Sequence, residues 1–379
     1  MTKTATTDIE SGKSRIDILL PSKERFSLAN SGAISGVVRD LVTASRTPDR
    51  LRVVGVAVEK PFAGVKFCGL RPRHGWLLGT NIGLASAYLH LIREGGKPDM
   101  VEVHSRCHVA RYLKVKRPDL NVALYLHNDP RDMRGAKTPA ERRSLLKAMS
   151  AVICVSDYIK ECFLDAVGAT EAESSKVQTA RNGAVRLHTK QTVKQKMVLI
   201  AGRMVPEKGI LECAQALSQV LKDRQDWRVV IAGAKRFENA SPGSYEADVA
   251  QALAPLGERA EMTGFIPIEQ VRDLQAQAAI IACPSIWHDP MPKAVLEALA
   301  AGSALLTTRR GGIPEAAEGR AHIIDDTSMS AFSAALEKLV SNDEYRNQLQ
   351  TLAWNDFPFT ADAMAKAADA IRDTVISRA

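Results

Sequence analysis

The chain has 379 residues, which exceeds the usual size of one hydrophobic core, so we expect two domains. With 45% hydrophobic and 25% charged residues, its composition excludes a disordered or fibrous protein. The net charge of +8 is uneven: residues 1–190 carry 31 Lys and Arg against 19 Asp and Glu, and residues 191–379 carry 20 against 24. The basic half suits phosphates or anionic lipid, although an ordinary solvated surface gives the same signal.

The termini and cysteines indicate a cytoplasmic protein. The sequence contains no apolar run of about 18 residues that would span a membrane. Residues 1–14 are polar and lack the apolar segment of a secretory signal, so we expect a flexible tail there. None of the six cysteines forms a Cys-x-x-Cys pair, which favours reduced thiols over disulfides or zinc.

Short apolar runs alternate with amphipathic helical stretches along the chain. Strands are expected at 15–20, 51–58, 100–104, 122–127, 151–155, 197–201, 228–232, 279–282, 304–307 and 321–324. Helices expected between them include 34–43, 140–149, 210–221, 268–276 and 293–301. This alternation predicts an α/β protein with two doubly wound, Rossmann-like domains built on parallel sheets.

The domain boundary is expected near the polar stretch 186–196, which has no helical period and precedes a new strand. The first domain then spans 15–190 and the second spans 191–356. The last segment, 357–379, is alanine-rich and helical in period, and we expect it to pack back towards the first domain.

Cations follow the strand expected at 197–201. Gly202 and Arg203 lead into Glu207-Lys208-Gly209 and then into a helix. Arg203 offers a planar fork and Lys208 a point charge, and both suit phosphate oxygens. The amides at the start of the next helix add to this preference. Taken alone, the motif fits an ordinary surface loop equally well.

Carboxylates follow the strand expected at 279–282. Asp289 lies in the loop and Glu297 inside the next helix. A carboxylate can accept hydrogen bonds from two sugar hydroxyls, although Asp289 could also be a simple helix-start charge. The amides of Met291 and Lys293 could approach a phosphate. A further turn, Arg309-Arg310-Gly311-Gly312-Ile313-Pro314-Glu315, follows the strand expected at 304–307.

In this order, the three stretches resemble the phosphate loop, the paired-acid motif and the glycine-proline turn of the family-4 retaining glycosyltransferases, which have the GT-B fold. The first half also resembles that family at Gly32–Leu41, His127–Pro130, Val155–Phe163 and Arg181–Gly183. The resemblance implies two Rossmann-like domains that face a central cleft. It departs from the family where Asp289 stands for the usual Glu and Ala33 for the second glycine.

The resemblance implies a role for each site residue. Arg203 and Lys208 would hold the donor diphosphate, Glu297 the ribose and Asp289 the donor sugar. The catalytic residues would then be Arg203, Lys208 and His127, and the donor-binding residues Gly32, Gly202, Ile266, Asp289, Met291, Pro292, Lys293 and Glu297. The nucleotide-sugar is a co-substrate, with UDP-sugars favoured over GDP-mannose, and no cofactor or metal ion is expected.

The acceptor is expected on the basic first domain. Its candidate residues for acceptor or membrane contact are Arg131, Arg134, Lys137, Arg142 and Arg143. With the apolar positions that follow them, they predict a peripheral contact with the inner face of the plasma membrane. We expect a saccharide or lipid-linked saccharide acceptor, as in lipopolysaccharide or exopolysaccharide biosynthesis. No nucleic-acid partner is expected, because aromatic residues are only 5% and are not interleaved with these cations.

Two alternatives stay open from the sequence. A nucleotide-sugar epimerase or hydrolase of the same fold would carry the same donor motifs but need no acceptor. A non-catalytic nucleotide-sugar-binding protein would also fit, although an intact Arg203 and Lys208 argue against it. His104 and His108 are expected to be structural or acceptor-side residues rather than catalytic ones.

Overall fold

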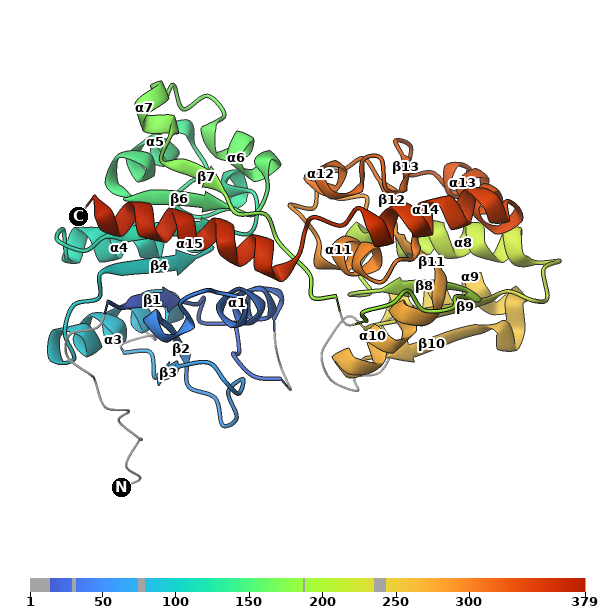
Figure 1. The fold of residues 1–379 in the computed structure, drawn as a ribbon, viewed down its shortest axis with the longest axis horizontal. Helices are drawn as coiled ribbons and strands as arrows, with labels where there is room; N and C mark the ends of the chain where they lie inside the picture. The colour runs from blue at the N-terminus through green and yellow to red at the C-terminus, as the bar shows by residue number, and fades with distance from the viewer. Residues whose placement is uncertain (1–13, 29–31, 74–78, 187, 235–242, 379) are drawn as a thin grey trace. The chain divides into compact units, whose positions relative to one another are not determined.

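The computed structural model describes residues 14–28, 32–73, 79–186, 188–234 and 243–378 (Figure 1). Nearly all of the tail expected at 1–14 lies outside them. The chain forms two compact units. The N-terminal unit combines residues 1–180 with 364–379, and the C-terminal unit spans 181–363.

The N-terminal unit is built on a seven-stranded parallel sheet with the order β3-β2-β1-β4-β5-β6-β7. Its strands are β1 Ile16–Leu19, β2 Leu51–Val56, β3 Phe67–Leu70, β4 Met100–His104, β5 Val122–Leu126, β6 Ala151–Cys154 and β7 Val177–Thr179. Its helices are α1 Ala33–Thr43, α3 Thr80–Glu94, α4 Cys107–Lys116, α5 Pro139–Ala148, α6 Asp157–Leu164 and α7 Glu171–Ser174, joined by the short 3-10 turns η1 Pro48–Arg50 and η2 Pro130–Asp132.

The last helix, α15 Ala361–Ser377, returns to the N-terminal unit and is drawn in red in Figure 1. Its small and apolar side chains Met364, Ala365, Ala368 and Ile371 are buried in the core of that unit. The alanine-rich period of the sequence therefore forms a face that packs closely against the sheet.

The C-terminal unit has a six-stranded parallel sheet with the order β10-β9-β8-β11-β12-β13. Its strands are β8 Gln195–Ala201, β9 Arg228–Ala232, β10 Ala260–Gly264, β11 Ala278–Cys283, β12 Ala304–Thr308 and β13 His322–Ile324. Its helices are α8 Ile210–Leu221, α9 Ser244–Leu253, α10 Ile268–Gln277, α11 Lys293–Ala300, α12 Ile313–Ala317, α13 Met329–Ser341 and α14 Asp343–Asn355, with the 3-10 turns η3 Pro206–Lys208 and η4 Ala254–Arg259.

The strand order reverses between β1 and β4 in one sheet and between β8 and β11 in the other. Such a switch point leaves a crevice beyond the carboxyl ends of the two strands, where ligands bind in open α/β sheets. The prediction of parallel, Rossmann-like sheets is confirmed. The sequence patterns missed β3, β7 and β10, because these edge strands are only partly buried and lack a continuous apolar run.

The described units divide after residue 180, whereas the sequence suggested a division at 190. Residues 181–184 belong with the C-terminal unit because they bond to it. Asn182 donates from Nδ2 to the carbonyl oxygen of Met291 at 3.0 Å, and Ala184 forms a parallel bridge with Thr360. Within the described residues, every helix is too short or too polar to cross a lipid bilayer. All six cysteines are free thiols.

Candidate active site

Two loops interlock at the switch point of the C-terminal unit, one after β8 and one after β11. The N–H groups of Ile286 and Trp287 donate to the carbonyl oxygen of Glu207, at 3.1 and 3.2 Å. Gly209 follows η3 with a left-handed φ of 63°, and a Cβ there would lie 2.2 Å from the carbonyl oxygen of Pro284. Only glycine fits this position, because both the backbone angle and the close approach exclude a side chain.

The loops bring together Lys208 and Asp289, which the sequence assigned to two different motifs. Lys208 Nζ donates to Asp289 Oδ2 at 2.5 Å, and Ser285 Oγ donates to the same oxygen at 2.9 Å. The Asp289 side chain is 9% exposed and that of Lys208 is 26% exposed. The carboxylate therefore orients the ammonium group at the edge of the switch point while leaving part of it open to a ligand.

A third loop, after β12, fixes the backbone of Asp289. The N–H of Gly312 donates to the carbonyl oxygen of Asp289 at 2.8 Å. Gly311 has a φ of 56°, and a Cβ there would lie 2.2 Å from that same oxygen. The glycine-rich turn after β12 thus positions the paired carboxylate.

Glycines also lie at the carboxyl ends of three strands: Gly202 follows β8, Gly233 follows β9, and Gly264 is the last residue of β10. Gly202 N–H donates to the carbonyl oxygen of Ala232 at 3.0 Å, and Gly233 N–H to that of Gly264 at 2.9 Å. A Cβ at Gly233 would meet the carbonyl oxygen of Gly202 at 1.9 Å. The next residue, Arg203, is exposed, and its side chain makes no hydrogen bond or ion pair with any residue that the structure describes. Its guanidinium is available to an anionic ligand.

Glu297 lies on the first turns of α11 and lines a pocket between α10 and α11. Its Oε2 accepts a hydrogen bond from Gln275 Nε2 at 3.3 Å. The pocket is lined by Val185, His188, Arg272, Gln275, Ala276, Lys293, Glu297, Ala300 and Ala301. A carboxylate held by an amide beside two cations suits a polyhydroxyl group such as a ribose.

The remaining predicted donor residues contribute mainly backbone. Met291 is 2% exposed and its side chain is part of the core, so only its main chain can face a ligand. Pro292 is the N-cap of α11 and has no N–H, which leaves Lys293 with the first helical amide. Ile266 is partly buried against the core and follows Phe265, which is 45% exposed.

In the N-terminal unit, His127 follows β5 and is 8% exposed. Its Nε2 lies 2.8 Å from Nδ1 of His104, and its N–H donates to Ser105 Oγ at 3.1 Å. Ser105 has a φ of 49°, a strained conformation of the kind often found at active sites. Burial lowers the pKa of His127 well below its ordinary value, and the neighbouring His104 lowers it further. His127 is therefore a neutral imidazole.

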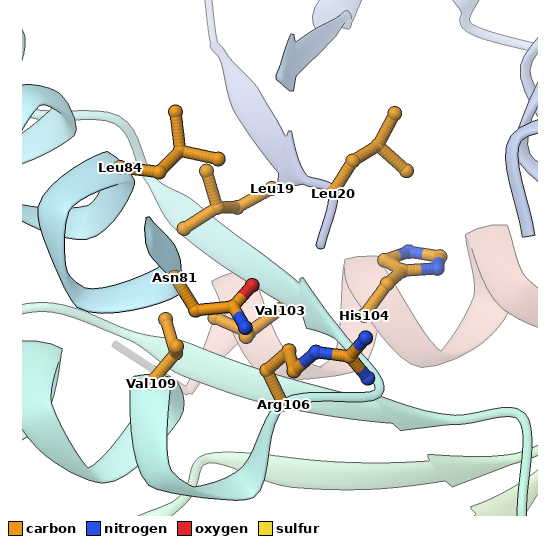
Figure 2. A pocket seen from close by; sticks show the side chains of 8 residues that line it. All are labelled: Leu19, Leu20, Asn81, Leu84, Val103, His104, Arg106 and Val109. Atoms are coloured by element: carbon orange, nitrogen blue, oxygen red, sulfur yellow. The ribbon is translucent and has the colours of Figure 1, made fainter. Parts of the chain in front are cut away.

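Gly32 is the N-cap of α1, and an acidic side chain occupies the space beside it. Ser35 N–H donates to Glu24 Oε2 at 3.1 Å, and a Cβ at Gly32 would lie 2.2 Å from that oxygen. Glu24 therefore complements the positive end of α1. A small pocket at the ends of β1 and β4 is lined by Leu19, Leu20, Asn81, Leu84, Val103, His104, Arg106 and Val109 (Figure 2).

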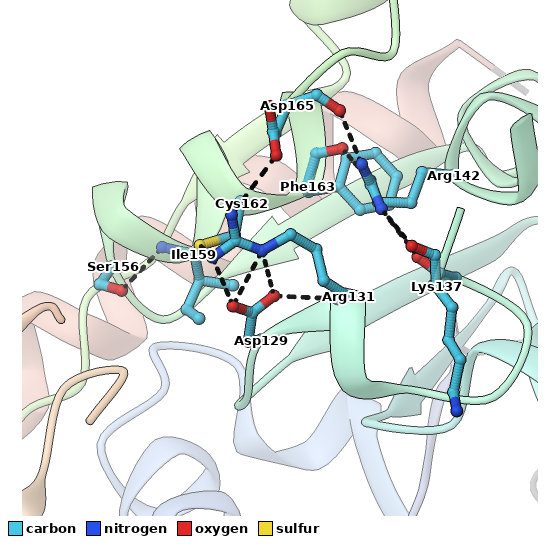
Figure 3. A network of polar contacts seen from close by, with 10 residues as sticks. Asp129, Arg131, Lys137, Arg142, Ser156, Ile159, Cys162, Phe163 and Asp165 are labelled. Carbon is cyan, nitrogen blue, oxygen red and sulfur yellow. Dashed lines mark hydrogen bonds and ion pairs between the residues drawn. The ribbon is translucent and has the colours of Figure 1, made fainter. Parts of the chain in front are cut away.

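Some of the cations predicted to face an acceptor or a membrane lie inside the fold instead (Figure 3). Arg142 is 2% exposed and donates to the carbonyl oxygens of Phe163, Ala136, Lys137 and Asp165 at 2.6–3.1 Å. It therefore caps buried backbone, which corrects its assignment to an acceptor or membrane face. The sequence showed a cation at helical spacing but not the carbonyl oxygens around it, which come from the loop before α5 and from the end of α6.

The neighbouring cations divide between internal and exposed positions. Arg143 donates to the carbonyl oxygens of Val167 and Gly168 and pairs with Glu173. Arg131 pairs with Asp129 at 2.7 Å. Arg134 and Lys137 are exposed. The apolar residues of this segment, Leu145, Leu146 and Met149, are buried in the core and do not form an outward apolar face.

Sequence reasoning missed Ser285, Glu24 and Glu102 as members of these networks. The pattern Met100-Val101-Glu102-Val103-His104 does carry a signal: two polar residues share one face of an otherwise apolar strand. Buried polar groups require partners, so this alternation indicates a polar network inside the sheet layer. Glu24, in contrast, lies in a loop whose path no local pattern predicts.

Residues 186–354 match the family model of the glycosyl transferases group 1. The putative glycosyltransferase YtcC of Bacillus subtilis is 29% identical over 270 residues, which cover 66% of this chain and 66% of that protein. The lipopolysaccharide 1,2-N-acetylglucosaminetransferase of Salmonella typhimurium is 24% identical over 229 residues, covering 57% of this chain and 56% of that protein. The matched segments thus span less than two thirds of either relative.

Among solved structures, Anabaena Alr3699/HepE in complex with UDP and glucose superposes with a TM-score of 0.73 at 15% identity, covering 96% of this chain and 100% of that one. This likeness shows the fold, which is GT-B, as predicted. The C-terminal part of the chain is thus similar to the glycosyl transferases group 1, and both relatives are named as glycosyltransferases.

Proposed function

We propose that this protein is a retaining glycosyltransferase that moves a sugar from a nucleotide-sugar to a hydroxyl group of a saccharide or lipid-linked saccharide. The observation that carries the proposal is the pairing of Lys208 with Asp289. Arg203 is exposed on the same loop as Lys208. Two cations at a switch point suit a diphosphate, and a carboxylate beside them suits sugar hydroxyls. Glycine backbone at the same edge lets a ligand approach closely.

In the proposed reaction, the bond between the anomeric carbon and the diphosphate oxygen breaks while the acceptor oxygen bonds to the same face of that carbon. The acceptor proton passes to the departing diphosphate. Arg203, Lys208 and the amides at the start of the following helix stabilise the charge that develops on this leaving group. We infer that these cations supply the positive charge, so that chelating agents leave the activity unchanged.

For the donor, we favour a UDP-sugar and keep GDP-mannose as the second choice. The UDP and glucose bound to a protein of the same fold support this order. We propose that Glu297 binds the ribose hydroxyls, and its position beside Gln275 in a pocket supports this. For the acceptor, the similarity to a lipopolysaccharide glycosyltransferase supports a role in cell-surface polysaccharide or lipopolysaccharide biosynthesis.

We further propose that the protein works in the cytoplasm and contacts the inner face of the plasma membrane through exposed cations such as Arg134 and Lys137. Flotation with anionic vesicles tests this part. Salt-sensitive binding that weakens in an Arg134→Ala/Lys137→Ala variant would support it, and no binding would contradict it.

The donor proposal is tested by thermal shift of the full chain with UDP, GDP, ADP and their sugars in the presence of EDTA. One nucleotide should stabilise the wild type and should lose its effect in Arg203→Ala. Arg228→Ala is the matched control, because Arg228 begins β9 at the opposite edge of the same sheet and its side chain donates to exposed Gln195. Equal stabilisation of wild type and Arg203→Ala would remove the assigned donor site.

Retention is tested separately once a donor is known. Proton NMR of the first-formed product should show the anomeric configuration of the donor. The opposite configuration would contradict a retaining mechanism while leaving the transferase assignment intact.

A further inference from the structure

A buried chain of polar side chains connects α15 to His127. Arg372 donates to both carboxylate oxygens of Glu102, from Nε and Nη2, at 2.9 Å each. Glu102 Oε1 lies 2.9 Å from His104 Nε2, and His104 Nδ1 lies 2.8 Å from His127 Nε2. The side chains of Arg372, Glu102 and His104 are at most 1% exposed. The chain therefore joins the last helix to a side chain at the carboxyl edge of the sheet.

The charge on Glu102 determines where the ring protons lie. The Arg372 guanidinium and the hydrogen bonds from His104 and Arg372 outweigh the effect of burial and lower the pKa of Glu102 to about 2. At neutral pH Glu102 is ionised and can only accept hydrogen bonds. His104 must therefore carry a proton on Nε2 and donate it to Glu102.

The same reasoning gives the tautomer of His127, the next ring in the network. His104 is fully buried, and a charge on a fully buried ring would lose its hydration, so the ring is taken as neutral. A neutral His104 with its proton on Nε2 has a lone pair on Nδ1 and must accept from His127 Nε2–H. His127 is then left with a lone pair on Nδ1, and this atom makes no hydrogen bond to any residue in the described part of the chain.

Ring stacking holds the planes in this arrangement. His104 stacks on Tyr125 with centroids 4.7 Å apart, and Tyr125 stacks on His127 at 4.9 Å. The His127 ring cannot flip without losing its hydrogen bond to His104 Nδ1. Figure 2 shows His104 at the end of β4, beside the pocket that opens at this edge.

We propose that Arg372, Glu102 and His104 are positioning residues that hold His127 in the tautomer with the Nδ1 lone pair, so that Nδ1 accepts a hydrogen bond from a substrate hydroxyl. The proposal rests on the proposed function for the identity of the ligand, a sugar. The tautomer itself follows from the buried network.

Several titratable or charged groups belong to this network or lie next to it. They are Glu102 on β4, Arg106 after β4, Tyr125 and His127 at β5, and Arg372 and Asp369 on α15. Asp369 shares Arg372 and also accepts from Ser45 Oγ and Arg46 N–H, so it anchors α15 without touching His104.

The first test is ring-nitrogen NMR of histidine-labelled full-length chain near neutral pH, with the His127 signals assigned through His127→Ala. We expect Nε2 of His127 to carry the proton and Nδ1 to be bare. A proton on Nδ1 would overturn the proposal. This measurement needs no substrate, so its outcome is independent of whether the proposed function is correct.

The second test removes the Glu102 carboxylate, which accepts the hydrogen bond from His104. Glu102→Gln/Arg372→Gln deletes both charges together and lets residue 102 donate or accept, so His127 should populate both tautomers. His104→Phe keeps the ring stacking and the α15 ion pair but breaks the relay, and it serves if the double variant does not fold. An unchanged single tautomer in either variant would overturn the proposal.

The third test asks whether the network acts through His127. Hydrolysis of UDP-glucose, UDP-N-acetylglucosamine or GDP-mannose by water is followed at saturating and low donor. The double variant should lower the rate about tenfold in the wild-type background, as expected for one lost hydrogen bond. It should cost nothing more in a His127→Ala background. Equal losses in both backgrounds would show a merely structural role and overturn the proposal.

Ser45→Ala is the matched control for these measurements, because it removes an α15 anchor outside the relay. It should lower the melting temperature and leave the tautomer and the hydrolysis rate unchanged. If no donor is bound or hydrolysed by the wild type, the proposed function fails while the NMR result still decides the tautomer.

Discussion

The carboxyl edges of the two sheets present different kinds of groups to a ligand. In the C-terminal unit, the groups at this edge are glycine backbone, a partly exposed Lys208 and an exposed Arg203. In the N-terminal unit, His127 is backed by a network that is almost completely buried. The difference teaches that cations stay accessible at one edge, whereas a buried network holds the His127 ring from behind at the other.

The same comparison shows why the uneven charge of the chain does not locate an anion-binding site. The N-terminal half has the larger excess of Lys and Arg, yet Arg142 donates its hydrogen bonds to carbonyl oxygens inside the fold. The C-terminal half has the smaller share of cations, yet it exposes Arg203 at its switch point. Regional net charge is therefore a poor guide to where an anion binds.

The largest expected effect tests whether the basic segment of the N-terminal unit is internal. Arg142→Ala removes the donor from four carbonyl oxygens, two of them in buried hydrogen bonds, and should lower the free energy of unfolding by about 3 kcal/mol or more. Urea unfolding of the full chain measures it. Lys137→Ala, at an exposed position nearby, should change stability little, and equal effects of the two variants would break the comparison.

The next effect separates two Lys–Asp pairs of the C-terminal unit that have the same 2.5 Å distance. Lys208→Met should lower the donor-dependent rate by about 10²–10³-fold, because a group that stabilises the leaving diphosphate is lost. Lys196→Met breaks a pair that is more than half exposed at the start of β8, and it should leave the rate unchanged. Equal losses would mean that the switch point is not the site of transfer.

The buried network of the N-terminal unit predicts a pH dependence of stability. The pKa of Glu102 is about 2 in the folded chain, below its ordinary value of 4.5. The stabilisation is therefore complete above about pH 4.5 and is lost as the pH falls towards 2, in total on the order of 3 kcal/mol. Glu102→Gln/Arg372→Gln should flatten this part of the unfolding curve, and an unchanged slope would contradict the assignment.

The smallest expected effect is on thermal stability, and it depends on the close approach of the loops after β8 and β11. Gly209→Ala and Gly319→Ala both place a side chain at a left-handed φ, 63° and 74°. Only the first also meets a carbonyl oxygen, at 2.2 Å, so it should cost about 1 kcal/mol or more beyond the control. Thermal melting compares the two variants. Only Gly209→Ala should lose stabilisation by nucleotides.

The sequence by itself determined the class of fold, because apolar runs separated by amphipathic helices fit parallel sheets covered on both faces. It also determined the residues of the C-terminal edge, since Arg203, Lys208 and Asp289 each follow a buried strand. These are local properties: they depend on the period of the chain and on what lies directly after a strand.

The tertiary structure alone decided which of these residues meet and which polar groups are hidden. Lys208 and Asp289 are paired although 81 positions separate them, and Glu102 and Arg372 although 270 do. No local pattern encodes such pairs, because they depend on which strands become neighbours in the sheet and where the last helix packs. For the same reason the sequence read Arg142 as a surface cation, whereas the fold surrounds it with carbonyl oxygens that need its hydrogen bonds.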